Sequence, residues 1–123
     1  MKKINIFIND KIFEGELNET EAAERIYQLL PIEADGNFWG EEIYFSIPLE
    51  MENENPTEDL KIGDLGYWPE GNGFCIFYGR TPDSTDDVPK PASPVTIIGR
   101  IKGELDSLKE LNQAKIKIEK AEQ

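Results

Sequence analysis

The chain has 123 residues, with 25 acidic and 13 basic side chains, one cysteine and no histidine. This length predicts a single domain over residues 1–123 that buries a core of its own. Without histidine there is no Ser-His-Asp or Cys-His catalysis, and a lone cysteine excludes an internal disulfide and a multi-cysteine metal cluster. The net charge of −12 argues against nucleic acid and anionic membranes as partners, because their phosphates would be repelled. We therefore predict neither a metal nor a cofactor.

The chain is expected to begin with a β-hairpin. From Ile4 to Ile8 every second residue is isoleucine, and this period of two predicts a strand with one apolar face. The Asn-Asp pair that follows is a two-residue hairpin signal. Residues 11–17 are the expected return strand.

A helical pattern follows the hairpin. Asn18 or Thr20 can cap the helix N-terminus, where acidic residues in the first turn are favourable. Pro31 ends the helix. One side of the helix carries the apolar residues Ala22, Ala23, Ile26, Leu29 and Leu30. This spacing predicts one amphipathic helix that covers an apolar surface.

Short strands return after the helix. They are expected from Ile32 onward, over residues 42–48, 65–68, 74–78 and 95–101, and around Ile116 and Ile118. Leucines at positions 105, 108 and 111 predict a short helix before the last strand. Seven or eight short strands with two separated helices predict a mainly β fold, a closed antiparallel barrel whose ends the helices cover.

Nothing in the sequence reads as a targeting or membrane segment. Polar residues interrupt the stretch behind Lys2 and Lys3, and no run approaches the roughly 18 apolar residues that span a bilayer. Together with the unpaired thiol, this predicts a cytoplasmic protein. The abundance of lysine, glutamate and isoleucine favours a thermophilic source.

Five separated runs carry a family resemblance: residues 38–45, 61–69, 73–82, 91–95 and 98–101. The first contains Trp-Gly-Glu-Glu, and the second reads Lys-Ile-Gly-Asp-Leu-Gly-Tyr-Trp-Pro. In this order they resemble a family of small uncharacterised prokaryotic proteins with a cyclophilin-like barrel. The resemblance covers essentially the whole chain. It implies an eight-stranded barrel capped by two helices, which agrees with the strand count.

Cyclophilins are prolyl isomerases, and the resemblance raises the question of that activity. In those enzymes an arginine hydrogen-bonds the prolyl nitrogen as the amide twists, against a barrier of about 18–20 kcal/mol. Residues 44–48 resemble a shortened form of their Phe-His-Arg strand, and the arginine position falls on Ser46. Residues 50–53 stand in place of their Phe-Met-x-Gln, and their later Trp and His have no counterpart. The resemblance therefore implies the fold without the catalytic motif.

Aromatic residues at adjacent strand positions point to a ligand groove. Tyr67 and Trp68 lie on opposite faces of their strand, as do Phe77 and Tyr78, so one of each pair faces the rim or the outside. Buried Tyr and Trp need partners for their polar atoms and therefore often lie at a rim. The candidate ligand-binding residues are Trp39, Glu42, Tyr44, Tyr67, Trp68, Phe74, Tyr78, Arg80 and Arg100.

Each candidate also has a structural interpretation. The aromatic residues can fill the core, and Arg80 or Arg100 can pair with surplus acid. Adjacent glutamates at positions 41 and 42 point to opposite faces and make no catalytic pair. Cys75, between apolar neighbours, is expected to be a buried, inert thiol. The acidic residues 50–59 lack calcium-loop spacing and are expected to form a solvated loop.

Three functions remain open at this point. The favoured hypothesis is a binding module whose aromatic barrel mouth accepts a short peptide or small molecule without turnover. The second is an atypical peptidyl-prolyl isomerase that uses Arg80 or Arg100 as its donor. The third, implied by the resemblance alone, is a domain that acts with a partner subunit, like the cyclophilin-like domains of biotin-dependent and amidohydrolase-type carboxylase complexes. No catalytic residue is assigned.

Overall fold

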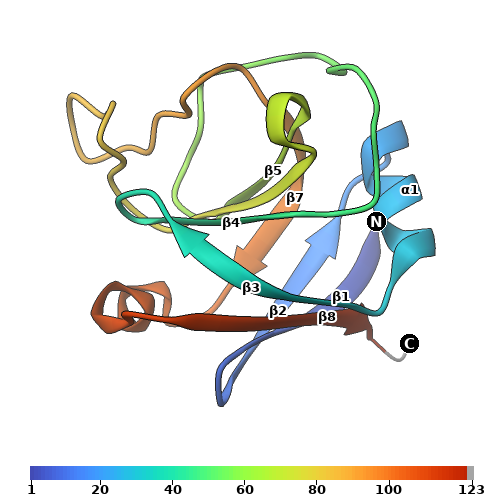
Figure 1. Ribbon diagram of the computed structural model, residues 1–123, viewed down its shortest axis with the longest axis horizontal. Helices are drawn as coiled ribbons and strands as arrows, with labels where there is room; N and C mark the ends of the chain where they lie inside the picture. Colours follow the sequence, from blue (N-terminus) through green and yellow to red (C-terminus); the bar gives the residue numbers. More distant parts are fainter. Residues whose placement is uncertain (122–123) are drawn as a thin grey trace.

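Eight strands close into an antiparallel barrel in the computed structural model, which describes residues 1–121 (Figure 1). The strands are β1 (Lys2–Ile8), β2 (Lys11–Leu17), β3 (Ile32–Phe38), β4 (Glu42–Ser46), β5 (Asp64–Trp68), β6 (Gly73–Phe77), β7 (Thr96–Lys102) and β8 (Ala114–Lys120). Around the barrel their order is β1-β2-β7-β5-β6-β4-β3-β8. The predicted closed eight-stranded barrel is confirmed.

The two predicted helices are present, and they differ in type. Helix α1 (Glu21–Leu29) begins at Thr20, whose Oγ1 accepts a hydrogen bond from Ala23 N at 3.2 Å. Asn18, the other predicted cap, accepts a 2.7 Å hydrogen bond from the Thr20 hydroxyl and so orients the cap. The second helix, η2 (Leu105–Glu110), is a short 3₁₀ helix with Leu108 buried. Figure 1 shows α1 and η2 on opposite sides of the barrel, and a third, one-turn 3₁₀ helix, η1 (Pro69–Gly71), connects β5 to β6.

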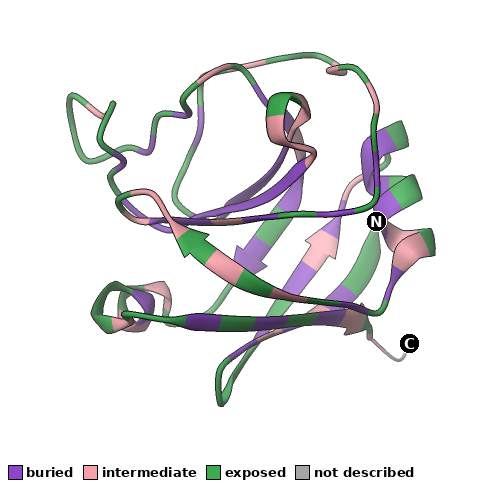
Figure 2. Cartoon of the chain, viewed as in Figure 1, coloured by how far each residue is buried: buried purple, intermediate pink, exposed green. Residues whose placement is uncertain are grey.

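The strands β4, β5 and β6 differ from the rest of the barrel in being covered on both faces. Every residue of β6 is buried, and so are four of the five residues of β5 (Figure 2). The described residues of β8, by contrast, follow an alternating pattern with an exposed outer face. Because a barrel interior covers only every second residue, something outside the barrel must cover the others on β5 and β6.

Two separate clusters account for this double burial. The inward residues of the three strands join the main core: Ile43, Phe45, Leu65, Tyr67, Phe74 and Ile76. The outward residues Cys75 and Phe77 form a second cluster with Leu60 and Val95, against which Tyr44 and Trp68 pack. This second cluster, named here the outer cluster, lies under the segments that connect β4 to β5 and β6 to β7. Within residues 1–121, no helix is both long and apolar enough to cross a membrane.

Candidate functional site

A pocket lies in the outer cluster, on the outer wall of the barrel. The register places Glu42 of β4 opposite Phe77 of β6, and Tyr44 opposite Cys75. All four side chains point outward, because the intervening Ile43 and Phe45 belong to the core. Nine residues line the pocket: Trp39, Glu42, Tyr44, Trp68, Cys75, Phe77, Pro91, Ala92 and Val95.

One outward position of β5, opposite Cys75 of β6, is a glycine. A Cβ on Gly66 of β5 would lie 3.2 Å from Phe77 and 3.3 Å from Val95. Both distances are tighter than ordinary contacts. The missing side chain therefore lets Phe77 and Val95 approach β5 and shape the pocket base.

The segment before β7 closes the pocket from outside. It supplies Pro91, Ala92 and Val95 to the lining. Trp68 Nε1 donates a 2.6 Å hydrogen bond to Ser93 Oγ, and Val95 forms an isolated β-bridge with Thr57. These contacts tie the segment to β5 and to the connection between β4 and β5, so the pocket has a fixed outer wall.

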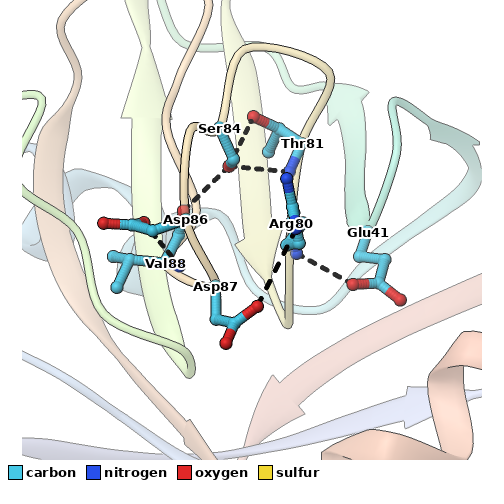
Figure 3. A network of polar contacts seen from close by, with 7 residues as sticks. All are labelled: Glu41, Arg80, Thr81, Ser84, Asp86, Asp87 and Val88. Carbon is cyan, nitrogen blue, oxygen red and sulfur yellow. Dashed lines mark hydrogen bonds and ion pairs between the residues drawn. The ribbon is translucent and has the colours of Figure 1, made fainter.

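A polar network holds the base of the same loop (Figure 3). Glu41 Oε1 accepts a 2.8 Å hydrogen bond from the Arg80 backbone N–H, where the chain leaves β6. Further along, Thr81 Oγ1 donates to the Lys90 carbonyl, and Ser84 Oγ donates to the Val88 carbonyl at 2.8 Å. The loop is thus closed on itself between residues 81 and 90, and this closure positions the pocket residues that follow.

The pocket has a buried base and an aromatic rim. Its volume is about 170 Å³. Glu42, Cys75, Phe77, Pro91 and Val95 are buried, whereas Trp39, Tyr44 and Trp68 are half-buried and Ala92 is exposed. The Tyr44 and Trp68 rings meet nearly at right angles, with centroids 6.3 Å apart and an interplanar angle of 78°. The rim is therefore a corner of two rings with Trp39 beside it.

Glu42 is the one charged group in the lining. It is 6% exposed, and no Lys or Arg among residues 1–121 forms an ion pair with it. Burial in apolar surroundings raises its pKa from 4.5 to about 7, although a hydrogen bond from the Cys75 thiol partly offsets this. Burial and the adjacent carboxylate also raise the pKa of Cys75, so the thiol stays protonated and serves as a donor. Cys75 is buried as predicted.

The structure brings together four of the nine candidate residues and places the other five elsewhere. Trp39, Glu42, Tyr44 and Trp68 line the pocket. Tyr67, Phe74 and Tyr78 belong to the main core. Phe74 stacks on Phe45 with centroids 5.2 Å apart, and the Tyr67 hydroxyl donates to the Leu49 carbonyl at 2.7 Å. These aromatic residues fill the barrel, in line with their structural interpretation.

Neither candidate arginine lines the pocket. Arg80 is exposed, and its guanidinium lies 3.9 Å from Asp87. Arg100 lies 3.4 Å from the buried Asp64 and also donates to the Ile62 carbonyl. Both arginines pair with acid, which is the structural interpretation set out above.

The expected aromatic mouth is on the outer wall instead of at a barrel end. The physical reason is that the inward aromatic rings pack the interior solidly, whereas the outward ones are covered by loops that leave a gap. Sequence reasoning did not assign Phe77, Cys75, Pro91, Ala92 and Val95 to the site. The opposite-face argument for Phe77 and Tyr78 was the available signal, since it requires one of the two to be outside.

The pocket is mainly apolar, and it contains no cluster of metal ligands among residues 1–121. No cluster of three or more Cys, Asp or Glu side chains within residues 1–121 is arranged to hold a metal ion. What the pocket offers is an apolar aromatic surface around one buried carboxyl. Such a surface favours a ligand with an apolar body and one polar group.

The sequence matches a known family model over nearly its whole length. The family model described as cyclophilin-like matches residues 2–119, so the chain belongs to the cyclophilin-like family. The solution structure of the hypothetical protein AF2241 from Archaeoglobus fulgidus is similar, with 34% sequence identity and a TM-score of 0.80. The similarity covers 98% of this chain and 95% of that one. A search of curated proteins found no match.

Proposed function

We propose that this protein is a binding module that holds a small organic group in the pocket on the outer wall of the barrel. The observation that carries the proposal is the Glu42 carboxyl, which is buried at the base of a cavity with aromatic walls and forms no ion pair within residues 1–121. A polar group left without a charged partner in such a place costs stability, and a ligand offsets that cost. A cavity kept open at this cost points to an occupant.

The size of the pocket limits what enters it. A volume of about 170 Å³ is close to that of a protein cavity that holds one benzene molecule, about 150 Å³. The ligand group is therefore a small molecule or a single side chain of a short peptide. A drug-sized ligand would extend past the rim.

The positions of the arginines do not support the alternative of a prolyl isomerase. That activity needs a guanidinium beside the bound amide, and neither Arg80 nor Arg100 lines the pocket. We therefore propose binding without turnover.

The two tryptophans of the chain test the proposal directly, since both line the pocket. Protein labelled with 5-fluorotryptophan gives one ¹⁹F resonance each for Trp39 and Trp68. In a screen of small fragments we expect some to shift both resonances saturably at millimolar concentration. Trp39→Leu, which retains Trp68 as reporter, weakens the same fragments. A library that moves neither resonance would refute the proposal.

A further inference from the structure

The chemistry of the pocket lining restricts the ligand further than the pocket volume does. Resting on the proposed function, we infer that the ligand presents a primary ammonium group to Glu42 and an aliphatic or aromatic body to the surrounding rings. Three parts of the pocket chemistry support this ligand: the carboxyl, the rings and the absence of a Lys or Arg in the lining.

The first part is the carboxyl. Glu42 lines the cavity and is only 6% exposed, so it is more than nine-tenths buried. Its polar neighbour there is the Cys75 thiol, a weak donor. A carboxylate accepts up to about four hydrogen bonds, so most of its capacity is free for a ligand. A primary ammonium supplies three donors and the opposite charge, and charge-assisted hydrogen bonds are about twice as strong as neutral ones.

The second part is the aromatic rim. An organic cation is attracted to the face of Trp and Tyr rings, and several rings set at angles to one another surround it better than one. Tyr44 and Trp68 meet at 78°, and Trp39 lies at the same rim. The Trp68 ring is also held in place through its hydrogen bond to Ser93. A ligand cation entering past the rim therefore finds favourable rings before it reaches Glu42.

The third part is the charge balance. No Lys or Arg belongs to the lining, so the ligand has no internal competitor for the carboxyl. The net charge of −12 raises the local concentration of cations around the whole protein. An anionic ligand would be repelled both by this negative field and by the ionised Glu42 carboxylate. Cations are thus favoured at long range by the field and at short range by the pocket.

Binding of an ammonium should depend on pH through Glu42. The other titratable groups in the lining are the Tyr44 phenol and the Cys75 thiol, and Glu41 faces the Arg80 amide instead. The segment before β7 and strand β5 contribute no charged lining residue. Because burial raises the pKa of Glu42 to about 7, the carboxyl is mostly protonated at pH 5.5 and ionised at pH 8.5. Affinity for an ammonium therefore falls between pH 8.5 and pH 5.5, by at most about 30-fold, which is the fall in the ionised fraction of Glu42.

The test is a titration of 5-fluorotryptophan-labelled protein with n-butylammonium at pH 8.5 and constant ionic strength. 1-Butanol is the neutral probe of matched size, and butyrate is the anionic one. We expect butylammonium to bind at least ten times more tightly than 1-butanol, and butyrate to bind worst. Glu42→Gln should lower the affinity for butylammonium to that for 1-butanol and remove the pH dependence.

A matched variant separates the pocket carboxyl from the general negative field. Glu33→Gln removes one exposed carboxylate from β3, outside the pocket, and should change the affinity for butylammonium less than twofold. If Glu42→Gln and Glu33→Gln behave alike, the ammonium assignment is overturned.

The three probes separate a loss of the ammonium preference from a loss of binding altogether. If 1-butanol binds as tightly as butylammonium, the ammonium inference fails and the binding module stands. If none of the three probes moves either tryptophan resonance, the inference fails, and the fragment screen then decides the fate of the binding module. An added arm with N-acetyl-lysine amide identifies the source of the ammonium. Binding as tight as that of butylammonium assigns a lysine side chain of a peptide, and much weaker binding assigns a free amine.

Discussion

The two faces of β4, β5 and β6 differ in how tightly their side chains are packed. On the inward face, Phe45, Tyr67 and Phe74 are at most 1% exposed and pack into a continuous core. On the outward face, Glu42 and Tyr44 border a cavity of about 170 Å³ that loops cover but do not fill. Alternation along these strands gives neighbouring residues different surroundings: one packs into the core, and the next borders the pocket.

The largest expected effect comes from the inward face. Phe45→Ala removes a buried ring stacked on Phe74 and should lower the free energy of unfolding by about 3–5 kcal/mol. Tyr44→Ala, one residue away and half-buried, should cost only about 1 kcal/mol. Urea denaturation of both variants measures the difference. Similar losses for the two would contradict the division between the faces.

The buried Glu42 carboxyl should have the next largest effect, a change in how the free energy of unfolding depends on pH. Between pH 4.5 and about 7 the folded protein keeps a proton on Glu42 that the unfolded chain has released. The stability that this bound proton contributes is therefore fully present below pH 4.5, and it is lost as the pH rises through about 7. Relative to the wild type, Glu42→Gln should gain up to about 3 kcal/mol across this range.

Urea unfolding at a series of pH values provides the measurement. The other carboxyl groups titrate in both proteins, so the difference between the two curves isolates Glu42. Parallel curves from pH 4.5 to pH 8 would show that this carboxyl has an ordinary environment.

A smaller effect is expected where the loop meets the pocket. Ser93→Ala removes the acceptor of the Trp68 indole N–H and should cost about 1 kcal/mol. It should also broaden or shift the Trp68 ¹⁹F resonance, because the ring is no longer held. Ser107→Ala removes a comparable hydroxyl hydrogen bond on η2 and should leave that resonance unchanged. If both serine variants left it unchanged, the loop would not depend on this contact.

The smallest effect should come from Arg80→Ala. The side chain is exposed, its ion pair with Asp87 is long, and the backbone hydrogen bond to Glu41 survives the substitution. We expect a change below about 0.5 kcal/mol in stability and below twofold in pocket affinity. A protease-coupled proline-peptide assay provides the contrasting test. Isomerase activity in the wild type that disappears in Arg80→Ala would contradict the proposed function.

The barrel could be predicted from the sequence because its signals are local. The alternating isoleucines of β1, the Thr20 cap and the stop at Pro31 each involve neighbouring residues, and the structure has the corresponding hairpin and helix. The opposite faces of adjacent strand residues could be predicted for the same reason: Trp68 and Phe77 lie in the outer cluster, whereas Tyr67 and Tyr78 lie in the core.

The pocket could be predicted only in part, because it depends on pairing across long stretches of chain. Glu42 meets Phe77 through the register of β4 and β6, and Pro91 reaches both through a loop. No local pattern fixes that register or the path of the loop. The inward and outward residues also look alike in the sequence, since β6 is apolar on both faces. That is why the sequence does not distinguish Phe74 and Tyr67, which lie in the core, from the residues that line the pocket.

Glu42 is the titratable group on which the proposed ligand depends, and ¹³C NMR of its side-chain carboxyl measures its pKa directly. We predict a titration midpoint near pH 7 in the free protein, because burial raises this pKa. Saturating n-butylammonium should lower the midpoint by at least one pH unit, since a bound cation favours the ionised form. A midpoint near 4.5 that butylammonium does not move would contradict both the buried carboxyl and its proposed ligand.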